Sequence, residues 1–288
     1  MKDRDFLSVI NNCNFRLSKG QRAIVHFINE NYDKAAFMTA GKLGKEVGVS
    51  DSTVVRFAVD LGYRGYPEMR KAMQDMVRSR LTSVQRIEVA KRTIDENNLI
   101  KSVISVDIEM LQTTLQQISH EDFNTIVDLL IKADHLYIVG MRTSTSLASF
   151  FALYMNLLRK NVHVIRDTAA SEVFEQMVRI GEKDVCFGIS FPRYSTKTVE
   201  SMSFAKARGA HVVGLTDSPT SPICSLSSVS LYAKSEMISF LDSLAAPLSV
   251  INALIVAVGA KTGQSAYDTF KELEDIWTKW GVYEPYRK

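Results

Sequence analysis

The chain has 288 residues, a formal net charge of +3 and 46% hydrophobic residues. That is enough for roughly two domains, and the composition is ordinary for a globular protein rather than a disordered or fibrous one. Three scattered cysteines, Cys13, Cys186 and Cys224, lack metal-finger spacing, and the polar first 20 residues do not look like a secretory signal, so we expect plain thiols, no metal and a cytoplasmic protein.

The first predicted helix covers residues 18–31. Ser18 stands where a hydroxyl caps a helix, and Ile24 and Ile28 recur at helical spacing with Ala23 and Phe27. We expect this helix to pack behind the segment that follows it.

The stretch Thr39–Leu61 has the pattern of a helix-turn-helix. Leu43 and Val47 share one face of a first helix, and Gly48 follows where the chain leaves that helix. Gly44 lies on the inner side, where a small residue lets two backbones cross. Ser50 can cap the second helix, whose predicted buried stripe is Val54, Phe57, Ala58 and Leu61.

The opposite face of the second helix is sized to enter a DNA major groove. It carries Asp51, Ser52, Thr53, Val55, Arg56 and Val59. The alternative is an ordinary helical hairpin in an all-α core. Charge favours DNA, because residues 1–92 hold 17 Lys and Arg against 10 Asp and Glu, whereas residues 93–288 hold 18 against 22. The predicted DNA contacts are Ser50, Asp51, Ser52, Thr53, Arg56, Lys45 and Arg64, with further phosphate candidates at Lys19, Arg22, Arg70 and Lys71.

Residues 62–67 form a predicted turn with two glycines and a proline, and a helix resumes from Glu68 to about Leu81. Residues 82–98 carry many charges with little apolar periodicity, which indicates a linker whose ends can be helical. We therefore expect a helix-turn-helix domain over 1–81, a linker over 82–98, and a second domain over 99–288. That domain begins with predicted helices at Leu99–Gln117 and Glu121–Lys132.

Beyond residue 134 the hydrophobic period changes to that of strands. Short β-branched or aromatic runs occupy His135–Val139, Val162–Ile165, Val185–Ile189, Val212–Leu215 and Val229–Tyr232. Predicted helices alternate with them at 144–159, 168–180, 196–208 and 238–260. This alternation predicts an α/β domain, a five-stranded parallel sheet with helices on both faces. The last helix contains the longest apolar run, Leu244–Ala260, which Pro247, Ser249 and Asn252 interrupt, so we expect a buried interface helix rather than a membrane span.

Hydroxyl side chains follow two of the predicted strands, each time with one arginine. In parallel sheets ligands bind beyond the carboxyl ends of the strands. A helix N-terminus lined with hydroxyls favours an anion, and arginine adds a forked donor for phosphate oxygens. The alternative is that these hydroxyls are merely helix caps. The predicted ligand-binding residues are Arg142, Thr143, Ser144, Ser146, Ser190, Arg193, Tyr194, Ser195 and Thr196.

The chain resembles the RpiR family of bacterial transcriptional regulators over nearly its whole length. The resemblance rests on VSDSTVVRF from Val49 and LGYRGYPEMR from Leu61, and on a region from Leu99 to Thr262 that is similar to a sugar isomerase (SIS) domain. It implies a five-stranded parallel sheet that binds phosphorylated sugars, with Ser144 in the first phosphate loop, and Ser190 and Ser195 in the second. Arg142 and Arg193 stand where the family usually has glycine, and Pro192 replaces a usual serine. Guanidinium groups therefore partly replace the backbone cradle.

No catalytic constellation is visible. Phosphosugar isomerisation needs a base such as Glu or His. Three of the five histidines, His135, His163 and His211, begin predicted strands, away from the ligand loops. Glu200 and Glu172 have no visible partner. We therefore predict a non-enzymatic, cofactor-free regulator of carbohydrate-metabolism genes. It binds operator DNA and a sugar phosphate as a homodimer or dimer of dimers and has no membrane partner. A phosphosugar isomerase with an accessory DNA-binding domain is the alternative.

Overall fold

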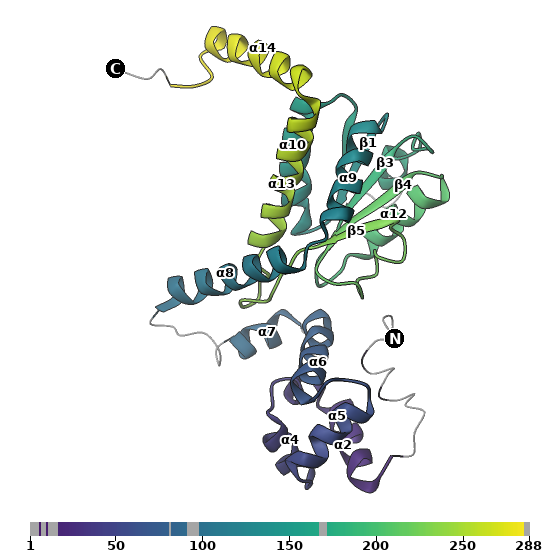
Figure 1. The fold of residues 1–288 in the computed structure, drawn as a ribbon, viewed down its shortest axis with the longest axis vertical. Helices are drawn as coiled ribbons and strands as arrows, with labels where there is room; N and C mark the ends of the chain where they lie inside the picture. Colours follow the sequence, from purple (N-terminus) through teal and green to yellow (C-terminus); the bar gives the residue numbers. More distant parts are fainter. Residues whose placement is uncertain are drawn as a thin grey trace. The chain divides into compact units, whose positions relative to one another are not determined.

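The computed structural model describes Phe6, Ile10 and residues 17–80, 82–90, 98–166 and 172–284. The chain divides into two compact units, one over Met1–Ile94 with Ser239–Leu241 and the other over Asp95–Ile238 with Asp242–Lys288. Figure 1 shows the first as a cluster of helices and the second as a sheet flanked by helices.

The first unit is built from helices that fold around a small apolar centre. Ile24, Ile28, Leu43 and Phe57 are fully buried there. Its elements are α2 (Lys19–Glu30), α3 (Tyr32–Ala35), α4 (Ala40–Val47), α5 (Asp51–Asp60), α6 (Tyr66–Arg80) and α7 (Ser83–Ala90). The predicted helices are present, and α7 occupies the first part of the predicted linker, whose ends we expected could be helical. Residues 91–97 of that segment lie outside the described residues.

The turn between α4 and α5 has the geometry that its sequence predicts. Gly48 ends α4 in the left-handed region with a φ of 73°, which favours glycine. Gly44 faces the turn so closely that a Cβ there would lie 2.7 Å from the Val49 carbonyl oxygen. The two helices therefore cross at a distance that only glycine allows.

The second unit is a five-stranded, all-parallel sheet with the order β2-β1-β3-β4-β5. The expectation of a parallel α/β fold is confirmed. The strands are β1 (Leu136–Gly140), β2 (Val162–Ile165), β3 (Val185–Ile189), β4 (His211–Thr216) and β5 (Val229–Tyr232). The helices are α8 (Leu99–Gln117), α9 (His120–Lys132), α10 (Ser144–Leu158), α11 (Glu172–Gln176), α12 (Thr196–Ala207), α13 (Ala245–Thr262) and α14 (Gln264–Trp280).

Helices cover both faces of this sheet with separate apolar cores. Residues of α9, α10 and α13 form one core with inward side chains such as Ile138 and Phe187. Residues of α11 and α12 form the other with Val139 and Cys186. Strands β1 and β3 are buried throughout, as expected for a sheet covered on both sides.

Two predicted helices have different bounds in the structure, and one helix was not predicted. The last predicted helix begins at Ala245 rather than 238, because Met237 pairs with Asp242 in a short bridge and Ser243 accepts a hydrogen bond from the Ala245 amide. Helix α11 spans only Glu172–Gln176, and residues 167–171 lie outside the described part. Helix α14 was not predicted at all.

Helix α13 is long and apolar enough to cross a membrane by length and composition alone. This is weak evidence, because core helices of globular proteins pass the same test. Ile251, Leu254 and Val258 of this helix lie in the core beneath the sheet, as the sequence predicted for a buried helix.

Candidate DNA-reading surface and anion site

Hydroxyl and carboxylate groups fix the N-terminus of α5. The Ser50 hydroxyl accepts a hydrogen bond from the Thr53 amide at 3.2 Å and lies 2.9 Å and 2.8 Å from the hydroxyls of Ser52 and Thr53. The Asp51 carboxylate accepts from the Ser52 amide at 2.8 Å. Ser50 and Asp51 therefore act first as caps that hold this end of the helix.

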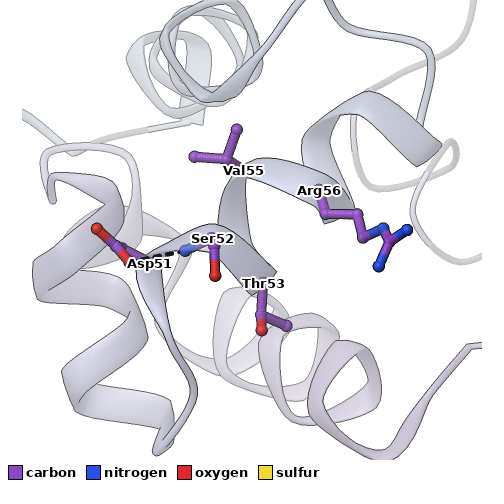
Figure 2. Close-up of a pocket in the computed structure, with 5 residues that line it drawn as sticks. All are labelled: Asp51, Ser52, Thr53, Val55 and Arg56. Atoms are coloured by element: carbon purple, nitrogen blue, oxygen red, sulfur yellow. Dashed lines mark hydrogen bonds between the residues drawn. The ribbon is translucent and has the colours of Figure 1, made fainter.

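The outward face of α5 lines a shallow, open depression of about 580 Å³ (Figure 2). In Figure 2 its lining residues come from successive turns of one helix, and the side chains of Val55 and Arg56 point away from each other. The depression is lined by Asp51, Ser52, Thr53, Val55 and Arg56. All five belong to the face that the sequence assigned to DNA, and Val54, Phe57 and Ala58 are buried on the opposite side.

The Lys and Arg residues of the first unit that we expected to contact DNA differ in their exposure and in their hydrogen bonds and ion pairs. Arg56 and Lys45 are exposed, and among the described residues neither forms an ion pair or hydrogen bond. Arg64 pairs with Glu68 at 3.3 Å, and this arginine's backbone amide and side chain hold the pKa of that carboxyl below its usual range. Arg70 is half-buried, with a buried Nε that has no hydrogen-bond partner. Lys19, Arg22 and Lys71 are exposed.

In the second unit, β1 and β3 are neighbouring parallel strands, but the helices that follow them lie on opposite faces of the sheet. These neighbouring strands pair from Leu136 with Val185 to Gly140 with Ile189. After β1 the chain enters α10 on one face, whereas after β3 it enters α12 on the other. A crevice outside the carboxyl ends of the strands at such a switch point is where ligands bind in doubly wound sheets. Both predicted ligand loops lie at this point.

The N-termini of α10 and α12 are not capped by their own side chains. Thr143 and Ser195 stand at the two cap positions, and neither side chain accepts a cap hydrogen bond. Four other described helices use a hydroxyl cap at this position, from Ser18, Thr39, Ser50 and Ser119. In α10 the amides of Ser144, Thr145 and Ser146 already donate to the carbonyls of Met141, Arg142 and Thr143. Among the described residues no such bond engages the amides of Thr196 and Thr198 in α12, so an anion can bind there, which weakens the alternative that Ser195 serves only as a cap.

Buried hydroxyls without partners gather at the second of these loops. Ser190 directly follows β3 and is 2% exposed, and Thr198 in the first turn of α12 is 0% exposed. Neither side-chain oxygen has a hydrogen-bond partner. Burying an unpaired hydroxyl costs free energy, so each such group calls for an explanation. Sequence reasoning missed Thr198, although its position within the first turn of a predicted helix was readable.

The residues of the first loop, which follows β1, differ in their exposure to solvent. Ser144 is buried, whereas Arg142, Thr143 and Ser146 are exposed. The Thr145 hydroxyl donates to the Gly140 carbonyl at 2.9 Å and closes the turn. Arg142 has a φ of 57°, in the left-handed region that glycine adopts most easily. An arginine thus holds a glycine-like conformation at the position where the sequence resemblance led us to expect glycine.

The second loop is anchored to the next strand. Arg193 and Thr196 are exposed, and Tyr194 and Ser195 are half-buried. The Tyr194 hydroxyl donates to Asp217, which follows β4, at 2.9 Å. Burial and the neighbouring Asp217 carboxylate raise the pKa of Tyr194, so this phenol stays protonated.

The titratable groups offer no catalytic pair in the described part of the chain. His135 and His163 lie 3.1 Å apart, Nδ1 to Nε2, at the edge where the strands begin. The carboxylates considered for a base, Glu172 and Glu200, are exposed. No group of three or more His, Cys, Asp or Glu residues suited to a metal ion occurs among the described residues.

Family models match both units in the expected order. Residues 4–80 match the helix-turn-helix domain of the rpiR family, and residues 129–257 match the SIS domain. The chain belongs to the RpiR family of helix-turn-helix transcriptional regulators. The resemblance drawn from the sequence is thereby confirmed.

Relatives of this RpiR-family chain agree with the assignment. It is 22% identical to an uncharacterised HTH-type transcriptional regulator of Clostridium perfringens over 85% of this chain and 88% of the relative. The sugar isomerase domain of an RpiR transcription factor from Sphaerobacter thermophilus matches 62% of this chain and 98% of its own, with 26% identity and a TM-score of 0.59. The Vibrio vulnificus NanR protein, solved with ManNAc-6P, matches 96% of this chain and 98% of its own, with 22% identity and a TM-score of 0.59.

Proposed function

We propose that this regulator binds the phosphate of a phosphorylated sugar between the N-termini of α10 and α12, and that this binding controls operator recognition by α5. The observation that carries the proposal is the N-terminus of α12, where the Ser195 side chain makes no cap hydrogen bond and the buried hydroxyls of Ser190 and Thr198 have no partner. A phosphate supplies several acceptor oxygens, which satisfy first-turn amides and hydroxyl donors together.

Several features support a phosphorylated sugar as the anion. Arg142 and Arg193 flank the loops as exposed cations, and each can add charge-assisted hydrogen bonds to a phosphate. The Vibrio vulnificus relative was solved with ManNAc-6P, a compound of this class. The ligand proposed here is therefore a sugar phosphate or a similar anionic carbohydrate.

Regulation by this route requires two conformations that differ in sugar phosphate affinity, and a pair of DNA-binding domains. Helix-turn-helix proteins usually bind paired half-sites as dimers, so we propose a homodimer or a dimer of dimers. A ligand that binds more tightly to one arrangement of the two DNA-binding domains increases the population of that arrangement. Operator recognition then follows the concentration of the sugar phosphate.

We also propose that the second unit senses its ligand without converting it. Isomerisation needs a positioned base near the sugar carbons. Glu200 and Glu172 are exposed, and the histidine pair lies where the strands begin, opposite the loops. Incubation with aldose and ketose phosphates should give no interconversion, and measurable turnover would favour the isomerase alternative.

A thermal-shift screen tests the sensor. Sugar phosphates, the matching unphosphorylated sugars and inorganic phosphate are each added to the full chain. A ligand at 100 times its Kd stabilises the folded state by about 2.7 kcal/mol. The expected result is a raised midpoint with a phosphorylated sugar only. A Ser144→Ala, Ser195→Ala double variant should lose that shift and keep its DNA affinity.

Alanine substitution of Ser190 or Thr198 adds a second test of the ligand site. If Ser190 and Thr198 serve a ligand, replacing either with alanine should leave the unliganded midpoint unchanged or slightly raised, because an unpaired buried hydroxyl is removed. The ligand-induced shift should shrink. A variant that loses stability without ligand and keeps the full shift would show that the hydroxyl has a purely structural role.

DNA binding is tested by selecting bound sequences from a pool of random duplexes. The duplex with the most enriched sequence is then titrated with the protein. Arg56→Ala should weaken binding and relax one base preference by about 1–3 kcal/mol. Lys45→Ala should weaken binding evenly across sequences and reduce its salt dependence. Lys271→Ala, an exposed lysine of the second unit, is the control. Unchanged affinity and selectivity in Arg56→Ala would remove Arg56 from the reading surface.

A further inference from the structure

Helix α5 exposes a valine in the middle of the face that we assign to DNA. Val55 is 41% exposed, whereas the adjacent Val54 is fully buried. Single exposed apolar side chains are common on proteins, so exposure alone gives Val55 no role. Its place does, because Val55 lines the open depression on the outward face of α5 (Figure 2). A β-branched residue also has a lower helix propensity than alanine, so helix stability does not account for a valine there.

Three of the five residues that line this depression are engaged at the N-terminus of α5. The Asp51 carboxylate accepts a hydrogen bond from the Ser52 amide at 2.8 Å. The hydroxyls of Ser52 and Thr53 lie 2.9 Å and 2.8 Å from the hydroxyl of the cap residue. Val55 and Arg56 are the two lining side chains outside this network of cap hydrogen bonds. An apolar branched group and a guanidinium are therefore the side chains of the depression best placed to contact bases.

The DNA major groove offers a specific partner to each of these two groups. Thymine carries a C5-methyl group on its groove edge, and apolar side chains recognise it by contact. Guanine presents the O6 and N7 acceptors that a guanidinium binds as a fork. In Figure 2 the side chains of Val55 and Arg56 point away from each other, so they face different base pairs.

We propose that Val55 recognises a thymine of the operator through its C5-methyl group, at a base pair separate from the one that Arg56 contacts. The inference rests on the proposed function, because it requires α5 to enter the major groove. Val55 is the fifth residue of α5 (Asp51–Asp60), and the N-terminal part of a recognition helix is the part that contacts base edges. Val59 lies one turn further along, is 52% exposed and is not among the residues that line the depression. It provides a matched control.

The surroundings of Val55 favour DNA over an apolar protein partner. The core of a protein–protein interface is depleted of charged residues and rich in large apolar groups. In the depression Val55 is the one apolar residue, beside two hydroxyls, a carboxylate and a guanidinium. One valine is enough to contact a thymine methyl group, but it is too small to anchor a protein. The excess of Lys and Arg over residues 1–92 likewise favours a nucleic acid.

Replacement of thymine by uracil in the operator tests this contact. The probe is the duplex most enriched when the full chain selects from random DNA, titrated at one fixed salt concentration. Each thymidine in turn is replaced by deoxyuridine, which removes the C5-methyl group and keeps the base pairing. At one position or more the affinity of the wild-type chain should fall about fourfold, the loss expected for one buried methyl-sized group.

The Val55→Ala variant shows whether Val55 is the residue that contacts the methyl group. It should bind the thymine duplex at least about fourfold more weakly than the wild-type chain, and should bind the thymine and uracil duplexes equally. Val59→Ala should still distinguish them. Because alanine favours a helix more than valine does, the melting midpoint of Val55→Ala should be unchanged or raised. Its loss of affinity would then not reflect unfolding.

Methylated cytosine gives an independent readout of the same methyl group. The sensitive T·A pair is replaced by C·G, with either cytosine or 5-methylcytosine, which restores a methyl group at C5. The wild-type chain should bind the methylated duplex more tightly, and Val55→Ala should not distinguish the two. The proposal is overturned if every uracil replacement leaves wild-type affinity unchanged, or if Val55→Ala still distinguishes thymine from uracil.

These experiments separate the thymine contact from the proposed function. If no sequence is enriched from random DNA, operator recognition by α5 is wrong and the contact fails with it. If the enriched duplex binds tightly but is indifferent to uracil, operator recognition stands and the thymine contact alone is wrong.

Discussion

The Tyr194 hydroxyl donates a hydrogen bond to the Asp217 carboxylate at 2.9 Å and so ties the loop after β3 to the loop after β4. Tyr194 is half-buried, and it is followed by Ser195, the cap residue of α12 whose side chain makes no cap hydrogen bond. The tie therefore fixes one wall of the proposed anion site. It acts on the ligand through loop position.

Removing this tie should loosen the site without dismantling the sheet. A hydrogen bond to a charged group contributes about 1.5–3 kcal/mol, so Tyr194→Phe should lower the melting midpoint by several degrees. Sugar phosphate affinity should also fall, because the loop must be ordered on binding. Calorimetric titration and a thermal melt of the same sample measure both effects. Unchanged affinity with a lowered midpoint would show that Tyr194 matters only for stability.

Arg142 holds a left-handed backbone conformation at φ 57°. Arg142→Gly should keep the fold, because relief of strain and the greater freedom of the unfolded chain oppose each other at about 1 kcal/mol each. The variant should still bind sugar phosphate more weakly if the guanidinium contacts the anion. Arg142→Val should be markedly less stable, since a β-branched residue resists this φ. Melting curves and ligand titrations of the two variants separate backbone from charge; equal stability of both would refute the backbone argument.

Gly44 and Gly41 make a matched pair on α4. A Cβ at residue 44 would lie 2.7 Å from the Val49 carbonyl oxygen, whereas nothing lies within 4 Å of one at residue 41. Gly44→Ala should therefore destabilise the first unit by about 1–3 kcal/mol and reduce DNA binding. Gly41→Ala should stabilise α4 by up to about 1 kcal/mol through helix propensity. Thermal melts followed by circular dichroism decide this, and similar effects of the two substitutions would refute the close crossing of α4 and α5.

We expect His163 to make the stability of the second unit depend on pH. Burial, and then the neighbouring His135, lower the pKa of His163 below its value in the unfolded chain. Protonation therefore favours unfolding, so stability is full above the unfolded pKa of about 6.5 and falls as pH decreases toward the folded value. The effect should be small, because the ring is largely exposed and solvent screens it. Melts between pH 7.5 and 5.5 should show a shallower decline in His163→Gln than in the wild-type chain; parallel curves would contradict the shift.

Short-range chemistry made much of this protein readable from its sequence. The cap at Ser50, the left-handed Gly48 and the buried row from Val54 to Leu61 depend on residues within two helical turns of one another. The alternation of strands and helices likewise follows from local periodicity, and it was enough to predict a parallel sheet. Helix α14 could equally have been predicted, because its apolar residues Phe270, Leu273 and Trp277 recur three and four residues apart, but it was overlooked. The sequence also places hydroxyls after β1 and β3.

Only the tertiary structure decided which of these groups are satisfied and which are not. Whether the hydroxyls of Ser190 and Thr198 find partners depends on side chains brought in from distant strands and helices. The 3.1 Å contact between His135 and His163 exists only because β1 pairs with β2. The same holds for exposed apolar side chains such as Ile104 of α8 and Trp280 of α14, since periodicity marks an apolar face but only packing shows whether the chain itself covers it. A sequence fixes hydrogen-bonding capacity and hydrophobicity residue by residue, whereas long-range packing determines which of them remain available to a ligand or a partner.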